Sequence, residues 1–361
     1  MVARNAYRLL VLVSAVALLY VLTPHIIYAA DYVRQTNPFS GQKYIEQAFE
    51  ASESELACLR ALPLPDESQS QAHHHKADPI PNVVHFIFGL KNPFDNPGAG
   101  KFDFLSYLAV RSAIVSLKPD AVYLHYTYLA EPPSPDAGAD PKTNPWIQRL
   151  APHIKLVHHP PGESRTHYAH LSDTMRLQFL LEGGGIYMDI DAFALRPFDK
   201  ILAAPSPHDV VLGAEGGNRW GLCNAIIAAR ANSTFVARWL RSYEDVDLSR
   251  EWNYHSVLLP KEMAVEHPEE VCALAPDAFF WPTWTWRHVE WMHEPLSREV
   301  AQHWKTQIER HGGSLFENQL AYHAWGQMAW DRHLKHLTPT VVRTKDTRFN
   351  LMVRQFMEDD L

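Results

Sequence analysis

The distribution of apolar and polar positions divides the chain into three parts. Residues 9–22 are apolar except for Ser14, and apolar character returns briefly before residue 30. The following stretch is polar, and from residue 80 onward short apolar runs alternate with segments of helical periodicity. The pattern therefore predicts a linker at 31–79 and one folded domain at 80–361.

The folded part shows strands and helices in alternation. β-Branched and aromatic residues predict strands at 82–89, 121–130, 154–159, 186–195, 209–216 and 224–230. Helical periodicity predicts helices at 102–117, 146–150, 168–182 and 235–243. Strands separated by helices are typical of a mainly parallel sheet covered on both faces, so we expect an α/β fold. The remainder, 246–361, is less periodic and rich in tryptophan, and we expect it to pack irregularly around a site rather than to form a second domain.

The N-terminal apolar segment is long enough to cross a bilayer. A spanning helix needs about 20 apolar residues, and residues 9–30 just reach that length. Arg4 and Arg8 precede the segment, and this basic flank predicts a cytosolic tail at 1–8 with the rest of the chain outside the cytosol. We expect a signal-anchor followed by a stem, and the alternative is a signal peptide cut after Ala30.

Charge and cysteine content limit the classes of function. The net charge of −8 argues against a nucleic-acid binder, because such proteins need a basic surface to release counterions. Three cysteines are too few for a disulfide scaffold. In an oxidising compartment one pair could form, and we expect Cys223 with Cys272. The 21 histidines exceed ordinary usage and raise the chance of a metal site.

The stretch 171–198 carries the densest set of candidate chemical groups. Residues two apart in a strand point to one face, so Asp189 and Asp191 would place two carboxylates on the same side where an apolar strand ends. Carboxylates this close repel each other unless a proton or a cation lies between them. A divalent cation with a bound diphosphate would satisfy both. An isolated Asp-x-Asp is more often a solvated strand end, so neighbouring residues must decide.

The helix before Asp189 makes a functional interpretation of the two carboxylates more favourable. Asp173 and Arg176 are three residues apart and lie on one helical face. A surface ion pair would explain them, and so would a position facing the same cleft as Asp189. Ligands bind at the carboxyl ends of strands in open α/β sheets, which favours the second explanation.

The order of these residues resembles the DXD region of glycosyltransferase family 32. The family pattern S-D-x-x-R, a short apolar stretch and G-G-x-Y-x-D-x-D is matched by Ser172, Asp173, Arg176, Gly184, Gly185, Tyr187, Asp189 and Asp191. Segments 81–85 and 321–325 are similar to the family's first strand and to a late motif with a histidine before an aromatic residue. The family includes yeast-type initiating α-1,6-mannosyltransferases, inositol-phosphoceramide mannosyltransferases and α-1,4-galactosyltransferases.

The resemblance, which spans about residues 80–330, implies a fold, a reaction and a location. It implies a single GT-A domain that transfers a hexose, with retention, from a nucleotide sugar such as GDP-mannose or UDP-galactose. The acceptor would be a glycan or a glycolipid such as a sphingolipid. The protein would be a type II membrane protein of the Golgi or the ER.

The resemblance also implies roles for individual residues. Asp191 would ligate a metal, usually Mn²⁺, and Asp189 would hold the ribose or a metal-bound water, so these two form the expected catalytic pair. His323 would be the third protein contact at the metal or the diphosphate. A borderline metal such as Mn²⁺ accepts imidazole together with carboxylate, which suits this set. The donor-binding residues would be Asp173, Arg176, Tyr187 and Asp189.

Candidates outside the motif are less specific. Glu215 could be a further acid near the cleft or a structural hydrogen-bond partner, and Asn224 and His255 have the same two explanations. A tryptophan-rich segment at 279–291 could form a platform for the sugar rings of an acceptor. Packing in the core is the alternative for its tryptophans, of which the candidates are Trp281, Trp284 and Trp286.

Two other functions stay open at the level of sequence. Phosphatases of the haloacid-dehalogenase type also carry Asp-x-Asp after a strand, but there the strand begins the domain. Here about 100 residues of α/β pattern precede the motif. The second alternative is an inactive sugar-binding homologue. The motif residues Asp173, Arg176, Asp189 and Asp191 are all present, which argues against this alternative.

Overall fold

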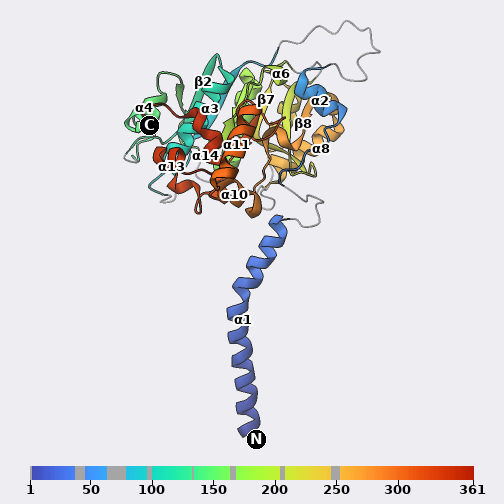
Figure 1. Cartoon of the computed structure of the whole chain (residues 1–361), viewed down its shortest axis with the longest axis vertical. Coiled ribbons are helices and arrows are strands. Elements are labelled where there is room, and N and C mark those ends of the chain that lie inside the picture. Colours follow the sequence, from blue (N-terminus) through green and yellow to red (C-terminus); the bar gives the residue numbers. More distant parts are fainter. Residues whose placement is uncertain are drawn as a thin grey trace.

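A seven-stranded sheet forms the centre of the globular part of the molecule (Figure 1). The computed structural model describes residues 2–36, 45–62, 79–95, 100–131, 134–162, 168–203, 208–244 and 253–361. The strand order is β3-β2-β1-β4-β7-β6-β8. These strands are Val83–Phe88 (β1), Ala121–Tyr126 (β2), Lys155–His158 (β3), Gly185–Met188 (β4), Val210–Glu215 (β6), Gly221–Ala229 (β7) and Val271–Leu274 (β8).

Most neighbouring strands are parallel, which confirms the predicted α/β fold. β1 runs parallel to β2 and β4, β2 to β3, and β6 to β8. β7 is the exception and runs antiparallel to both β4 and β6. Because β7 reverses direction between them, β4 and β6 point the same way. The carboxyl ends of β1, β4 and β6 therefore lie along one edge of the sheet.

The strand predicted at 186–195 is in fact two strands. β4 ends at Met188, and β5 (Ala192–Ala194) leaves the large sheet to pair with β9 (Ala321–His323) in a second sheet. The turn between them is closed by the Ala192 amide, which donates to the Asp189 carbonyl at 2.8 Å. Asp189 and Asp191 therefore lie in this turn, and the prediction that they share one strand face is wrong.

The glycine triplet before β4 performs the tight turn that the sequence predicts. Gly184 and Gly185 have φ of +65° and +114°, in the region that favours glycine. A Cβ on Gly185 would lie 2.5 Å from the Val83 carbonyl oxygen. A Cβ on Gly183 would have nothing within 4 Å, so two of the three glycines are required for the turn.

Helices cover both faces of the sheet, and alternate strand residues supply the two cores. In β4, Ile186 and Met188 join one apolar cluster while Tyr187 joins the other, because successive side chains of a strand point to opposite faces. The second cluster contains residues of α5 (Tyr168–Gly183), α7 (Thr234–Arg241) and α8 (Leu259–Glu266). The first contains residues of α3 (Phe104–Leu117), α4 (Pro145–Leu150), α6 (Asp199–Leu202), α11 (Arg298–Arg310), α13 (Pro339–Thr344) and α14 (Arg348–Val353).

The region 246–361 is more regular than its sequence predicts. It supplies β8 and β9 to the two sheets, together with α9 (Pro276–Phe279), α10 (Trp286–His293) and α12 (Gly326–Ala329). A π-helical segment (Tyr254–Leu258) and short 3-10 turns lie between them. Its helices range from 4 residues in α9 to 13 in α11, and such short segments leave little periodicity in the sequence.

The N-terminal part begins with a long helix, α1 (Val2–Thr36), which extends away from the globular part (Figure 1). Among the residues that the structure describes, no helix combines the length and the apolar content needed to cross a bilayer. A spanning segment at 9–30 therefore stays a prediction.

Part of the segment predicted as a linker is attached to the domain. Within residues 31–79, a helix α2 (Glu53–Arg60) begins at a capping box formed by Ser52 and Glu55 and lies beside β8. A disulfide joins Cys58 of α2 to Cys272 of β8. This segment is held by the domain because a covalent bond and buried side chains fix it there.

The predicted disulfide between Cys223 and Cys272 is wrong. Cys223 lies on β7 and Cys272 on β8, and β6 separates these strands in the sheet. Two strand spacings are roughly 10 Å, beyond the roughly 7 Å between Cα atoms that a disulfide allows. Cys223 is a buried free thiol.

Candidate active site

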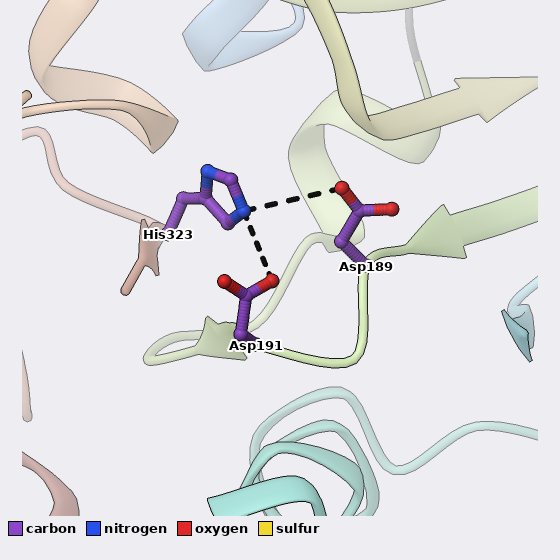
Figure 2. Close-up of side chains that lie close together, drawn as sticks. All are labelled: Asp189, Asp191 and His323. Atoms are coloured by element: carbon purple, nitrogen blue, oxygen red, sulfur yellow. Dashed lines mark hydrogen bonds and ion pairs between the residues drawn. The ribbon is translucent and has the colours of Figure 1, made fainter. Parts of the chain in front are cut away.

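Two carboxylates and one imidazole converge just beyond the end of β4. His323 Nε2 lies 3.0 Å from Asp191 Oδ1 and 3.9 Å from Asp189 Oδ2 (Figure 2). The ligand atoms of the three residues all lie within 4.8 Å of one another. The pairing of Ala192 with His323 between β5 and β9 brings the histidine to the carboxylates.

In each carboxylate one oxygen, here called the inner oxygen, faces His323: Oδ2 of Asp189 and Oδ1 of Asp191. The other, outer oxygen accepts a hydrogen bond from the protein. Asp189 Oδ1 accepts a hydrogen bond from the Tyr187 hydroxyl at 2.7 Å, and Asp191 Oδ2 accepts one from the Gly326 amide at 2.6 Å. Contacts of this kind orient metal ligands in proteins. The two inner oxygens and the imidazole face one another and form a donor set that suits a divalent cation such as Mn²⁺.

The charges of the three groups depend on one another. Burial opposes ionisation of Asp191, but His323 and the Gly326 amide outweigh it, so the pKa of Asp191 is lowered. Burial raises the pKa of Asp189, although Arg176 and His323 partly offset the effect. Burial would lower the pKa of His323, yet the neighbouring carboxylates raise it. Carboxylates this close need a proton or a cation between them, so a metal ion at this place would take over the role of the protons.

Arg176 connects this cluster to the helix before it. Its guanidinium lies 3.1 Å from Asp189 Oδ1 and 3.3 Å from Asp173 Oδ1, and it packs over the Tyr187 ring at 4.3 Å. It also donates to the Asn224 carbonyl at 2.9 Å. Asp173 and Arg176 are buried, so the explanation as a surface ion pair is wrong.

Asn224, a weak candidate at the level of sequence, makes a hydrogen bond in the same network. Its side-chain amide donates to Asp173 Oδ1 at 2.7 Å. Burial opposes ionisation of Asp173, but Arg176 and these hydrogen bonds lower its pKa overall. The geometry therefore brings together the polar residues that the DXD resemblance singles out, plus Asn224.

A cavity of about 480 Å³ lies beside the cluster at the carboxyl ends of β1 and β2. Ser172, whose hydroxyl accepts from Arg176 at 3.1 Å, lines it from α5. Gln327, next to Gly326, lines it from α12. Sequence reasoning missed most of its walls, which include Gly89, Leu90, Lys91, Tyr128, Glu131, Asp136 and Tyr168. Only their position after predicted strands could have indicated them.

The two weaker candidates Glu215 and His255 differ in their position relative to the metal cluster. Glu215, at the end of β6, is buried, accepts from Trp284 Nε1 at 3.0 Å and interacts electrostatically with His323. His255 lies in the π-helical segment and packs on Tyr243 at 5.1 Å between ring centroids. Burial and the neighbouring Asp173 raise the pKa of Tyr243, so the tyrosine on which His255 packs lies close to Asp173.

The proposed tryptophan platform divides into core and surface residues. Trp281 is fully buried and donates to the Ile45 carbonyl at 2.6 Å, so its prediction as a platform is wrong. Trp284 is half-buried and contacts Glu215. Trp286 is half-buried at the start of α10.

Comparison with known proteins assigns the family. Residues 110–206 match the family described as "Glycosyltransferase sugar-binding region containing DXD motif". Over 291 residues the chain is 36% identical to "Glucan organizing enzyme 1" of Cryptococcus neoformans var. grubii serotype A, covering 77% of this chain and 71% of that protein. The chain belongs to this glycosyltransferase family. The enzyme is thus a glycosyltransferase, and the phosphatase alternative no longer applies.

Solved structures with a similar arrangement are also glycosyltransferases. The PaToxG glycosyltransferase matches with a TM-score of 0.38 and 14% identity, covering 78% of this chain and 88% of that one. Mouse xyloside xylosyltransferase 1 matches with a TM-score of 0.37 and 11% identity, covering 69% and 99%. Both TM-scores are below 0.5, so the family assignment rests on the sequence match.

Proposed function

We propose that this glycosyltransferase uses a divalent cation, with a GT-A arrangement of its domain, to transfer a hexose from a nucleotide sugar with retention. The convergence of Asp189 Oδ2, Asp191 Oδ1 and His323 Nε2 carries the proposal. When bound, the cation supplies positive charge to the leaving diphosphate. Retention and the GT-A arrangement come from the family resemblance.

The residues of the chain have distinct roles in this proposal. Asp191 and His323 hold the cation, and Asp189 holds it or the ribose. Arg176, in the middle of α5, is fixed by Asp173 and Asp189, and both acidic partners keep its guanidinium in one orientation. Tyr187 fixes the outer oxygen of Asp189. These fixed dipoles and charges stabilise the transition state because they need no reorganisation during the reaction.

The cavity at the ends of β1 and β2 is the proposed place of the nucleotide. Its 480 Å³ is within the size range of small-molecule sites. Ser172 and Gln327 connect it to the donor motif and to the metal cluster, so a diphosphate at the cluster would lead its nucleoside into the cavity. The donor would be GDP-mannose or a UDP-hexose, and the acceptor a glycan or glycolipid. The name of the relative from Cryptococcus favours a glucan among these.

Donor turnover tests the proposal directly. The purified chain is incubated with GDP-mannose, UDP-galactose and UDP-glucose, with Mn²⁺ or with chelator, and release of nucleoside diphosphate is measured. We expect release with one donor, its loss in chelator, and a decrease of about 100-fold or more in Asp191→Asn.

Control variants and outcomes separate the alternatives. Asp331→Asn removes an exposed carboxylate that pairs with Lys335 at 3.3 Å and should retain activity. Undiminished turnover in Asp191→Asn or in chelator would contradict the metal assignment. No turnover with any donor, together with binding of one, would favour an inactive sugar-binding homologue.

We also propose that the enzyme is a type II membrane protein of the Golgi or the ER. The apolar segment 9–30 with its basic flank supports this. The disulfide between Cys58 and Cys272 also supports it, because disulfides persist in oxidising compartments. After alkaline carbonate extraction of cell membranes, the full chain should stay in the pellet and a chain lacking residues 1–30 should not. Extraction of the full chain into the soluble fraction would contradict the anchor.

A further inference from the structure

Glu215 lies on the opposite side of the metal cluster from the nucleotide cavity. In the order of the sheet, β1 and β2 are on one side of β4, and β6 is on the other. The cavity lies at the ends of β1 and β2, whereas Glu215 ends β6 on the same edge. A sugar donor bound at the cluster would thus have its nucleoside on the β1 side. The space for the group that attacks the sugar would be toward β6.

Trp284 is held next to this carboxylate by an anchored loop. Gln319 Nε2 donates to the Trp281 carbonyl at 2.9 Å, and Trp325 Nε1 donates to the Pro282 carbonyl at 2.9 Å. The Thr283 amide donates to His288 Nδ1 at 3.0 Å. Three consecutive residues are therefore fixed by hydrogen bonds before the chain reaches Trp284.

The same loop is coupled to the metal cluster. The ring of Trp325 packs against that of His323 with 4.3 Å between centroids. His323 lies 3.0 Å from Asp191 at the cluster. The indole of Trp284 is half-buried, and its one polar atom is occupied by Glu215 at 3.0 Å. Trp284 is therefore a partly exposed tryptophan whose indole is oriented by a buried carboxylate.

A second tryptophan lies beside the end of β6. Trp220 is 41% exposed in the turn between β6 and β7, and its neighbour Gly221 pairs with Glu215. Single exposed apolar residues are common on protein surfaces, so Trp220 matters here for its place beside Glu215 and not for its exposure alone. Aromatic residues on both chain segments that flank Glu215 suit a ligand with apolar ring faces and hydroxyl edges.

We propose that Trp284 forms the apolar wall of an acceptor subsite, where it stacks on the C–H face of a hexopyranose. Glu215 is the positioning residue that fixes the indole for this contact. The inference rests on the proposed function, because it takes the side of the cluster toward β1 as the donor side. The sugar can come from a soluble glycan or from a glycolipid, which share the pyranose ring.

The test separates acceptor binding from donor turnover. With the active donor held at saturation, transfer is measured against methyl glucoside, methyl mannoside, a soluble glucan oligosaccharide and detergent-solubilised hexosylceramide. Hydrolysis of the donor by water is measured in parallel. In Trp284→Ala the acceptor KM should rise about tenfold, with little change in hydrolysis, because the contact with an aromatic ring contributes at most about 1.4 kcal/mol.

Variants of Glu215 test its role separately. Glu215→Gln keeps an oxygen that accepts from the indole, so its acceptor KM should stay near that of the wild type. Glu215→Ala should raise the acceptor KM as Trp284→Ala does. Trp291→Phe alters a half-buried tryptophan of α10 that packs on Trp304 and should change neither measurement.

Each outcome decides between the two proposals. Equal losses of transfer and hydrolysis in Trp284→Ala, with the acceptor KM unchanged, would overturn the acceptor subsite and leave the metal-dependent function intact. A loss of kcat in Glu215→Gln would replace the positioning role with a chemical one. Absence of metal-dependent turnover in the wild type would overturn both proposals. The acceptor with the lowest KM among those tested shows whether the sugar comes from a soluble glycan or a glycolipid.

Discussion

At the scale of single residues, Asp191 is fixed by a backbone contact that leaves no room for a side chain. The Gly326 amide donates to Asp191 Oδ2 at 2.6 Å. A Cβ on this glycine would lie 2.8 Å from the same oxygen, closer than such contacts are found in proteins. The position of the carboxylate therefore depends on the absence of a methyl group at residue 326.

Gly326→Ala should weaken binding of the cation without unfolding the protein. The new methyl group displaces Asp191 from His323, so we expect the Mn²⁺ concentration for half-maximal turnover to rise about 10-fold or more. Gly183→Ala is the matched control, because nothing lies within 4 Å of its Cβ position. A metal titration that coincides for Gly326→Ala and the wild type would contradict this account of the site.

At the scale of elements, three histidines connect neighbouring strands under α5. His85 Nδ1 lies 3.1 Å from His125 Nε2, and His125 Nδ1 lies 2.9 Å from His159 Nε2. The ring of Phe179 stacks on His125 at 3.8 Å between centroids. Burial lowers the pKa of His125 to about 3 and that of His85 to about 4. His85 and His125 are therefore neutral in the folded protein, and their rings pack between β1, β2 and α5.

The depressed pKa of His125 makes stability depend on pH in a defined direction. Between pH 3 and 6.5 the unfolded chain binds a proton at this histidine that the folded chain excludes, so stability falls as the pH falls through this window. The slope is about 1.4 kcal/mol per pH unit for one histidine.

His125→Gln should reduce the pH dependence of stability by about 1.4 kcal/mol per unit between pH 4 and 6, because the variant has no group to protonate there. The free energy of unfolding is measured in urea at several pH values. His153→Gln, at an exposed histidine after α4, should leave the slope unchanged. Identical slopes in His125→Gln and the wild type would show that His125 is not the group responsible.

At the scale of the whole molecule, a disulfide and a salt bridge attach the segment before the domain. Cys58 and Cys272 are 214 residues apart in sequence. Arg219 in the turn after β6 lies 2.6 Å from Glu55 of α2. The Trp281 indole donates to the Ile45 carbonyl in the same segment. Residues 45–62 therefore stabilise the loop that carries Trp284.

Removing the disulfide should destabilise the domain. Cys58→Ser is expected to lower the free energy of unfolding by about 2–5 kcal/mol, because a long loop in the unfolded chain is no longer closed. Cys223→Ser is the control, because Cys223 is a free thiol. A non-reducing digest of this variant should still yield the disulfide-linked peptide that contains Cys58 and Cys272. Recovery of a Cys223–Cys272 peptide from the wild type would show that the disulfide is placed wrongly.

Much of the donor site could be predicted from sequence because its residues are local. Asp173, Arg176, Tyr187, Asp189 and Asp191 lie within one helix, the strand β4 and the turn after it, so their short separation in sequence keeps them close. Periodicity alone did not fix the acidic pair, because β4 ends before Asp189. His323 was expected only from the family resemblance, since it comes 132 residues after Asp191. The acceptor side was less predictable, because half-buried and fully buried tryptophans have the same sequence pattern.

The sequence by itself determined the α/β class, the buried strands and the local groups of the donor motif, because these follow from residue type and short-range spacing. Only the tertiary structure decided three other features: the pairing of β7 with β4, the pairing of Cys58 with Cys272, and the contact between Glu215 and Trp284. These depend on which distant segments pack together. That choice is made by the free energy of the whole core and not by any local pattern.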